Sequence, residues 1–482
     1  MKLQLAALFV FLAIQFLPLR KIQSQNFVQL TTHDSPLEIV KMAAHVCPSE
    51  RQAAWQELEF TVFIHFGMNT FSNREWGEKG TSATVFNPTN LNAEQWVKTA
   101  KMAGAKLLIM VAKHHDGFCL WPSKYTDYTV KNSPWRGGKG DVMAYVAAAC
   151  KKHGIKLGVY LSPWDMNSPL YGTEDYNQHF RNQLTELLTR YGPVDEVWFD
   201  GACGEGANGK RQVYDWQGYY NTIRSLQPQA VIAIMGPDIR WVGTESGCGR
   251  ETEWSVVPLA SASTDSIAAH SQQNGLKNGT FMPPGNMMAE DLGSREKIWG
   301  AKTLIWYPSE VDVSIRPGWF YHASEDSLVK NPEKLVDIWY NSVGRNSVLL
   351  LNLPPDRRGL IHKNDVSALK GMKKILNATF GRNLAEKAAI TSKDSIIILD
   401  LPAVVTFDRV MICENFRNGQ RVEAFAVDTW NGDSWIEINH GTTIGYKRLL
   451  RFDPVTSGKV RLRILAARDT PEIITFGLFK AP

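Results

Sequence analysis

Polar side chains that could bind or cleave a substrate follow four apolar segments between residues 60 and 201. His65 ends the first segment, His114 and His115 follow the second, Tyr160 lies near the end of the third and Asp200 ends the fourth. A carboxylate at the end of an apolar run is costly to desolvate unless it pairs with a cation or takes part in catalysis. An Asp that only opens a loop is the structural alternative. Four such segment ends in succession favour a shared site.

Glycoside hydrolysis is one reaction open to a carboxylate in such a site, and it needs a second carboxyl group to protonate the leaving oxygen. Asp200 would be one of the two groups. The candidates for the other are Glu245, Glu251, Glu253 and Glu310. The residue types alone do not choose among these four glutamates.

A metal centre and a serine nucleophile are the two rival chemistries. Adjacent histidines at a strand end point apart, and His114 and His115 are not part of an HxxxH or HExxH spacing. Ser162 lacks the GxSxG elbow of serine hydrolases. We therefore expect a site without a metal ion or an organic cofactor, in which the histidines bind hydroxyl groups of the substrate.

Short apolar runs alternate with helical patterns from about Phe60 to Asn352, and this alternation favours parallel strands joined by crossover helices. The eight expected strands are Thr61–Phe66, Lys106–Ala112, Lys156–Leu161, Glu196–Asp200, Ala230–Met235, Glu253–Val257, Thr303–Trp306 and Ser347–Leu351. The helices expected between them are Ala93–Ala103, Val142–His153, Tyr176–Tyr191 and Trp216–Leu226. In a (β/α)8 barrel, functional groups gather where the strands end. The sequence therefore predicts an α/β fold built on a (β/α)8 barrel.

The pattern changes after Asn352. One more helix is expected over Val366–Leu376, and short alternating strands begin near Ala388. These strands are Ser395–Leu399, Val410–Cys413, Val422–Asp428, Ser434–His440 and Lys459–Leu465. We expect three segments: a signal peptide over residues 1–25, a catalytic barrel over 26–380 and a C-terminal β-sandwich over 381–482.

The first 25 residues resemble an export signal. Lys2 precedes the uncharged run Leu5–Ile14, and a polar stretch follows. We expect export to the periplasm or the medium, with no stable membrane span after cleavage. Loss of this leader removes three basic residues and no acidic one, so the formal charge falls from +5 to +2. That charge is too small to suggest a nucleic-acid partner, and the oligomeric state stays open.

The stretch from Phe60 to Asn352 resembles the catalytic domain of family 29 α-L-fucosidases. The resemblance rests on six motifs in this order: His65-Phe66-Gly67, Glu75-Trp76-Gly77, Lys113-His114-His115-Asp116-Gly117-Phe118, Ser162-Pro163-Trp164-Asp165, Trp198-Phe199-Asp200-Gly201 and Ser314-Ile315-Arg316-Pro317-Gly318-Trp319-Phe320-Tyr321. It implies a retaining exo-α-L-fucosidase that forms a covalent fucosyl-enzyme and acts on fucosylated oligosaccharides or glycoconjugates. The C-terminal strands resemble the discoidin-like, galactose-binding-like sandwiches often attached to such enzymes.

The resemblance also implies a role for each motif residue. Asp200 matches the nucleophile of the family. The residues that match its substrate-binding positions are His65, Glu75, Trp76, His114, His115, Tyr160 and Trp319. The histidines and the tyrosine would bind fucose hydroxyls, and the two tryptophans would form walls around the sugar.

The general acid differs among subgroups of the family. The subgroup that acts on α-1,3- and α-1,4-linked fucose in branched glycans carries it in a Trp-x-Gly-Asn-Glu-like motif. This chain has Trp241-Val242-Gly243-Thr244-Glu245, with Thr where that motif has Asn. The resemblance thus implies Glu245 as the acid/base and branched glycans as substrates. The alternatives are a retaining barrel glycosidase for another sugar, such as an α-galactosidase, and a non-catalytic glycan-binding protein.

Overall fold

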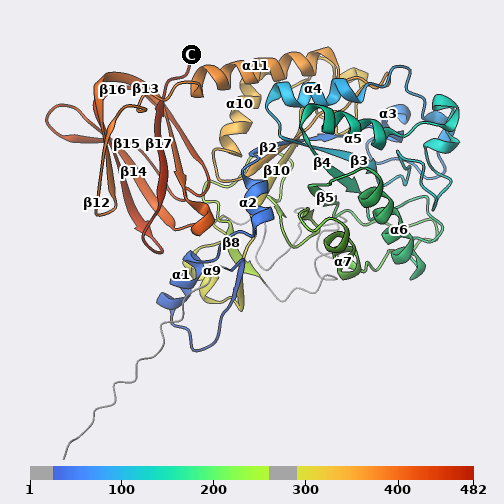
Figure 1. The fold of residues 1–482 in the computed structure, drawn as a ribbon, viewed down its shortest axis with the longest axis horizontal. Coiled ribbons are helices and arrows are strands. Elements are labelled where there is room, and N and C mark those ends of the chain that lie inside the picture. Colours follow the sequence, from blue (N-terminus) through green and yellow to red (C-terminus); the bar gives the residue numbers. More distant parts are fainter. Residues whose placement is uncertain (1–24, 260–289) are drawn as a thin grey trace, which may run out of the picture.

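The computed structural model describes residues 25–259 and 290–482, arranged as a barrel beside an all-β domain (Figure 1). The predicted export signal lies almost wholly outside the described residues and stays a prediction. Over the described ranges, none of the helices has both the length and the apolar character that a membrane crossing requires.

Eight parallel strands form the barrel, as the sequence predicts. They are β2 (Phe60–Ile64), β3 (Leu107–Lys113), β4 (Lys156–Leu161), β5 (Glu196–Phe199), β6 (Val231–Ile234), β7 (Arg240–Trp241), β10 (Ser309–Ser314) and β11 (Val348–Asn352). Their order in the sheet is β6-β5-β4-β3-β2-β11-β10-β7. A single parallel bridge between Ala233 and Ile239 connects the two edges, so the cylinder is nearly closed.

Helices surround the cylinder (Figure 1). The longer ones are α4 (Ala93–Ala103), α5 (Val142–His153), α6 (Asp175–Arg190), α7 (Trp216–Leu226), α10 (Pro332–Asn341) and α11 (Lys363–Phe380). The shorter ones are α1 (Pro36–Ala44), α2 (Glu50–Gln56), α3 (Met68–Ser72) and α9 (Arg295–Trp299). Local sequence sets their ends. In α5, the Asp141 carboxylate accepts the N–H of Ala144 at 2.9 Å, and Gly154 adopts the left-handed conformation that ends the helix.

Alternation along the strands divides the barrel into two cores. One set of side chains packs in the interior and includes Phe63, Ile109, Tyr160, Trp198 and Leu350. Their chain neighbours pack outward against the helices and include Val62, Met110, Val159, Val197 and Leu351. Strands such as β2 and β3 are therefore apolar on both faces, which is why they appear in the sequence as continuous apolar runs.

Two of the eight strands predicted for the barrel do not belong to it, so this part of the prediction is wrong. The segments predicted at Glu253–Val257 and Thr303–Trp306 are β8 (Val256–Leu259) and β9 (Thr303–Trp306), which pair antiparallel with each other. Together with β1 (Phe27–Gln29) they form a separate three-stranded sheet. The barrel contains β7 and β10 instead. Strand β7 has only two residues, and β10 alternates valines with acidic side chains, so neither produces an apolar run.

The C-terminal domain is a β-sandwich, as predicted. Its strands are β12 (Ala389–Lys393), β13 (Ile396–Glu414), β14 (Val422–Trp430), β15 (Trp435–Gly441), β16 (Arg448–Ala467) and β17 (Ile473–Phe479). The two strands predicted at Ser395–Leu399 and Val410–Cys413 are the two ends of β13. Register shifts between Asp400 and Val405 bend this strand, so that one end pairs with β12 and the other with β17.

Candidate active site

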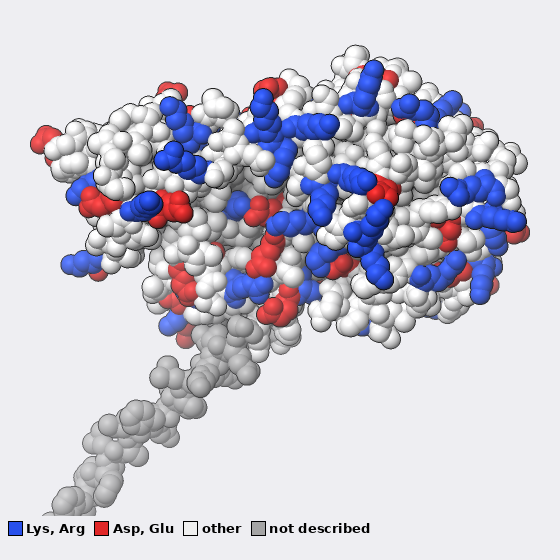
Figure 2. Space-filling view, turned by 45° about the horizontal axis from the view of Figure 1, so that its top comes forward, with Lys and Arg blue, Asp and Glu red and all other residues white. Residues whose placement is uncertain are grey.

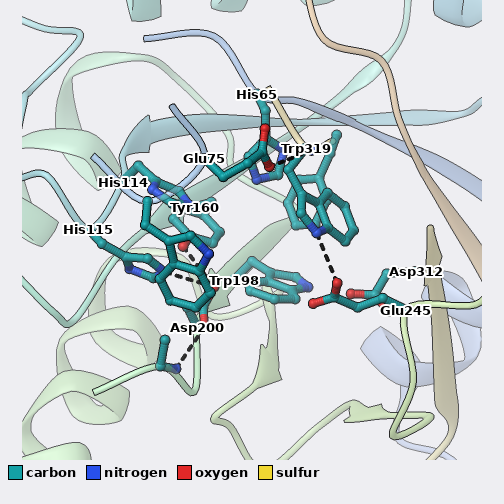
Figure 3. A pocket seen from close by; sticks show the side chains of 13 residues that line it. His65, Glu75, His114, His115, Tyr160, Trp198, Asp200, Glu245, Asp312 and Trp319 are labelled. Carbon is teal, nitrogen blue, oxygen red and sulfur yellow. Dashed lines mark hydrogen bonds and ion pairs between the residues drawn. The ribbon is translucent and has the colours of Figure 1, made fainter. Parts of the chain in front are cut away.

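One cavity of about 160 Å³ lies at the ends of the barrel strands, and all nine residues that the sequence singled out line it (Figure 3). The complete lining is Phe63, His65, Glu75, Trp76, His114, His115, Tyr160, Trp198, Asp200, Ala202, Glu245, Asp312 and Trp319. The residues come together because parallel strands present their C-terminal ends at the same face of a barrel.

Asp200 follows β5 and is held in one orientation by its neighbours. The Tyr160 hydroxyl donates to its Oδ2 at 2.9 Å, and the N–H of Ala202 donates to its Oδ1 at 2.7 Å. His115 Nε2 lies 3.7 Å from the same Oδ2, and the carboxylate is about a quarter exposed. Hydrogen bonds to both oxygens fix the orientation of the carboxyl group, which faces the cavity.

The three histidines of the cavity are neutral imidazoles. Burial lowers the pKa of His65 to about 4 and the pKa of His114 well below its ordinary value, and it lowers the pKa of His115 as well. His65 Nδ1 lies 2.8 Å from Asn352 Oδ1, and His115 Nδ1 lies 2.8 Å from the Ser162 hydroxyl. Because one nitrogen of each of these two rings is engaged, ring orientation is fixed, and the site offers uncharged hydrogen-bonding groups.

Glu245 reaches the cavity from the segment that follows β7. Its Oε2 accepts the indole N–H of Trp319 at 3.0 Å (Figure 3). Burial raises the pKa of Glu245, and the negative charges of Asp200 and Glu75 raise it further. One carboxyl with a raised pKa beside a hydrogen-bonded carboxylate is the division of roles that an acid and a nucleophile require.

Glu75 holds the segment that carries Trp319. Its Oε2 accepts the N–H of Trp319 at 2.7 Å, and its Oε1 accepts the N–H of Phe320 at 3.1 Å. His322 Nε2 lies 2.6 Å from the same Oε1. These contacts occupy both oxygens, so Glu75 organises the wall of the cavity in addition to lining it.

The indole rings of Trp76 and Trp319 form two sides of the cavity mouth. Trp76 stacks on His115 with ring centroids 5.2 Å apart and is about half exposed. The Trp319 ring lies 5.2 Å from the His65 ring. Aromatic faces of this kind bind the apolar C–H faces of sugars.

The other three glutamates considered as acids lie outside the cavity. Glu253 is buried in ion pairs with Arg240 and Arg250, and Glu251 forms ion pairs with Arg345 and Arg448 where the sandwich meets the barrel. Glu310 lies deeper in the barrel, where the indole of Trp198 donates to its Oε1 at 2.8 Å. These three glutamates make contacts that stabilise the fold. Glu245 is the one of the four that lines the cavity.

Sequence reasoning did not identify Asp312, Trp198, Phe63 or Ala202 as lining residues. Trp198 belongs to the Trp198–Gly201 motif, and Phe63 lies on the inner face of β2. The signal for Asp312 was the alternation of acidic and apolar residues in Glu310–Ser314. Within residues 25–259 and 290–482, no group of three or more His, Cys, Asp or Glu side chains is arranged to hold a metal ion.

Comparison with known proteins identifies the family. The α-L-fucosidase family model matches residues 40–379. The chain is 41% identical to α-L-fucosidase 1 of Arabidopsis thaliana over 469 residues, which covers 90% of this chain and 87% of the plant protein. A crystal structure from Bacteroides ovatus, described as a presumed α-L-fucosidase, is 50% identical with a TM-score of 0.87 and covers 95% of this chain and 78% of its own.

A third relative has a bound sugar. The Ruminococcus gnavus family 29 fucosidase in complex with fucose is 31% identical, has a TM-score of 0.77 and covers 91% of this chain and 95% of its own. The family model spans more than half of this chain, and the similarity extends through barrel and sandwich alike. The chain therefore belongs to glycoside hydrolase family 29, the α-L-fucosidases.

Proposed function

We propose that this α-L-fucosidase is a retaining exo-enzyme that removes terminal α-1,3- and α-1,4-linked L-fucose from branched glycans. The observation that carries the proposal is the pairing of Asp200 and Glu245 in one cavity of about 160 Å³. A small cavity walled by indole and imidazole rings accommodates one terminal sugar and excludes the interior of a glycan chain.

In the first step, a carboxylate oxygen of Asp200 attacks the anomeric carbon of fucose. The bond from that carbon to the aglycone oxygen breaks, and Glu245 donates its proton to the departing oxygen. The products of this step are a β-linked fucosyl ester on Asp200 and the free aglycone. The raised pKa of Glu245 favours the protonated form that this transfer requires.

In the second step, Glu245 acts as a base. It removes a proton from water while the water oxygen attacks the anomeric carbon and the ester bond to Asp200 breaks. The Tyr160 hydroxyl, which donates to Asp200 Oδ2, stabilises the carboxylate as it leaves. Two displacements at one carbon restore the original configuration, so the sugar is released as α-L-fucose.

The neutral histidines suit the transition state of both steps. Positive charge develops on the sugar ring as its bonds at the anomeric carbon lengthen. An imidazolium beside the ring would oppose that charge, whereas a neutral imidazole binds a hydroxyl without doing so. Burial, which lowers the pKa of all three histidines, supports this role.

The linkage preference is supported by the position of Glu245 on the segment Trp241–Glu245, at the cavity mouth beside Trp319. A branched substrate presents a second sugar at this mouth, and contacts with that sugar raise kcat/KM if they strengthen in the transition state. We expect kcat/KM for Lewis-type trisaccharides to exceed that for α-1,2-fucosylated oligosaccharides by about tenfold or more, the factor given by ~1.4 kcal/mol of extra contact.

Time-resolved proton NMR of the released sugar tests both parts of the proposal on the same linkage set. Initial appearance of α-L-fucose, fastest from the branched substrates, is the expected result. Initial release of β-L-fucose would exclude retention. Equal rates on α-1,2-linked and Lewis-type substrates would exclude the linkage preference.

A further inference from the structure

A neutral imidazole carries one hydrogen on its two ring nitrogens, so one nitrogen donates a hydrogen bond and the other accepts one. The position of this hydrogen decides what the ring offers to a substrate. His65 and His115 are neutral and line the cavity. Each ring has a hydrogen-bond partner whose own contacts determine on which nitrogen the hydrogen lies.

Ser162 determines the position of the hydrogen in His115. The Ser162 hydroxyl group has one hydrogen, and its oxygen lies 2.7 Å from the carbonyl oxygen of Trp164, which only accepts. This contact uses the hydrogen of Ser162. The same hydroxyl oxygen lies 2.8 Å from Nδ1 of His115, so here it accepts and Nδ1 is the donor. Nε2 of His115 therefore carries no hydrogen.

Asn352 determines the position of the hydrogen in His65. Its Nδ2 donates to the carbonyl oxygen of Trp319 at 2.7 Å and to the hydroxyl oxygen of Ser314 at 2.9 Å, which uses both amide hydrogens. Its Oδ1 accepts the backbone N–H of His65 at 3.3 Å. These contacts fix which end of the amide is the oxygen. Nδ1 of His65, 2.8 Å from that oxygen, is therefore the donor, and its Nε2 carries no hydrogen.

The bare nitrogen of His115 faces the proposed nucleophile (Figure 3). Nε2 of His115 lies 3.7 Å from Oδ2 of Asp200, which is longer than a hydrogen bond and fits two acceptors that face each other. Among the residues that the structure describes, none forms a hydrogen bond with Nε2 of His65 or of His115. Both nitrogens are therefore available to a substrate in the cavity.

The opposite tautomer of His115 would slow the reaction. A hydrogen on Nε2 would be donated to Oδ2 of Asp200, which already accepts the Tyr160 hydroxyl at 2.9 Å. A hydrogen bond stabilises a free carboxylate more than the uncharged ester that forms from it, so a second one at this oxygen would raise the barrier to attack. A bare Nε2 avoids this cost and accepts the hydrogen of a sugar hydroxyl instead.

We propose that Ser162 and Asn352 are positioning residues that hold His115 and His65 in the tautomer with the hydrogen on Nδ1. Both rings then accept hydrogens from hydroxyl groups of the sugar, and His115 does not donate to Asp200. Neither Ser162 nor Asn352 lines the cavity, so each acts through its histidine. The inference rests on the proposed function, in which Asp200 attacks fucose.

Nitrogen-15 NMR of the unliganded wild-type enzyme with labelled histidine measures the position of the hydrogen, because ring nitrogens with and without a hydrogen resonate at well-separated frequencies. The variants His65→Gln and His115→Gln assign the signals of the two rings among the 11 histidines of the chain. We expect a hydrogen on Nδ1 and none on Nε2 in both rings. A hydrogen on Nε2 of either ring would overturn the inference.

The variant Ser162→Ala removes the acceptor for Nδ1 of His115, so the hydrogen should move to Nε2, where Asp200 accepts it. NMR should show this change of tautomer. The value of kcat/KM on an aryl fucoside should fall by about tenfold, the factor given by ~1.4 kcal/mol, which is the size of one hydrogen bond. Ser162→Thr keeps a hydroxyl group and should retain both the wild-type tautomer and most of the activity.

Ser123→Ala is the matched control. Ser123 is as fully buried as Ser162, and its hydroxyl donates to Glu186 at 2.7 Å, outside the cavity. This variant should keep the wild-type kcat/KM and the wild-type NMR signals of both cavity histidines. If Ser162→Ala loses activity while the hydrogen of His115 stays on Nδ1, the role of Ser162 is structural and the inference is wrong.

The outcomes separate this inference from the proposed function. If Asp200→Ala keeps wild-type turnover, the proposed function is wrong and the inference falls with it. If Asp200→Ala is inactive but the wild type carries a hydrogen on Nε2 of His115, the inference alone is wrong and the proposed function stands. Hydrogens on Nδ1 of both rings in the wild type, with a change of tautomer in Ser162→Ala and none in Ser123→Ala, support the inference.

Discussion

At the scale of single residues, the environment divides chemically similar groups into different roles. Asp200 receives two hydrogen bonds and faces the cavity, whereas Glu245 lies at the cavity mouth, accepts one indole N–H and has a raised pKa. The cavity histidines are all kept neutral by burial. These differences lead to two predictions, one about proton transfer and one about stability.

The variant Glu245→Gln should lose about 10²- to 10⁴-fold in kcat/KM on natural fucosylated glycans, the usual contribution of a general acid. Its loss on an aryl fucoside with a good leaving group should be much smaller, because that leaving group needs no proton. Steady-state kinetics on both substrates measures the contrast. The control is Glu251→Gln, which lies outside the cavity. The assignment fails if the control shows the contrast and Glu245→Gln does not.

The free energy of unfolding should decrease as the pH is lowered below about 6.5. The pKa of His65 is lowered to about 4 in the folded protein, so between these two pH values the unfolded chain binds a proton that the folded chain does not. Each unit of pH in this window then costs up to about 1.4 kcal/mol for each such histidine.

Denaturant unfolding of His65→Gln at several pH values checks this expectation, and the variant should show a shallower slope than the wild type. The exposed His440 provides the control variant, His440→Gln, whose slope should not change. Equal slopes for His65→Gln and the wild type would contradict the account.

At the scale of elements, loops that follow different strands hold one another in place. Glu75, after β2, accepts the backbone N–H groups of Trp319 and Phe320, which follow β10. Trp319 in turn donates to Glu245, which follows β7. We therefore expect a change at Glu75 to affect the wall of the cavity and Glu245, the proposed acid/base.

Glu75 accepts hydrogen bonds with both of its carboxylate oxygens. In the variant Glu75→Gln, only one side-chain oxygen remains to accept them. We expect a several-fold increase in KM for fucosides and a loss of about 1–3 kcal/mol in unfolding free energy, because a buried N–H is left without a partner. Kinetics and denaturant unfolding measure the two effects. Glu325→Gln is the comparison, since Glu325 accepts only the N–H of Gly318 with one oxygen. An unchanged KM in Glu75→Gln would show that the clamp does not shape the site.

The sequence predicted only some of the strands that carry residues of the site. Strand ends that carry His65, His115, Tyr160 and Asp200 could be recognised because each follows a continuous apolar run. The strand that carries Asp312 was missed, because its inward side chains are acidic and interrupt the apolar run, and the indole groups that pair with these acids lie far away in the sequence. Local patterns do not reveal such partners.

At the scale of the whole molecule, the sandwich buttresses the barrel at a distance from the cavity. Gln420 accepts the N–H of Ser255 at 2.8 Å and donates to the carbonyl of Glu253 at 2.9 Å. Asn346 of the barrel accepts the N–H of Tyr446 at 2.9 Å. None of the residues that line the cavity comes from the sandwich.

The variant Gln420→Ala should lower stability and leave catalysis intact. It leaves the buried N–H of Ser255 without its partner, which costs about 1–3 kcal/mol, whereas the carbonyl of Glu253 still accepts the side-chain amide of Asn346 at 3.2 Å. Thermal unfolding should show a lower Tm, while kcat/KM on an aryl fucoside at 25 °C stays at the wild-type value. Val404→Ala, at an exposed position, should change neither quantity. A reduced kcat with an unchanged Tm would contradict a supporting role for the sandwich.

The most direct test of the central claim is the anomeric configuration of the product formed by Asp200→Ala in the presence of azide. This variant should lose several orders of magnitude in turnover, and azide should then occupy the space of the missing carboxylate and attack an activated aryl fucoside from that side. NMR should show β-L-fucosyl azide, the inverted product. Formation of the α-azide, or wild-type turnover without azide, would contradict the assignment of Asp200 as the nucleophile.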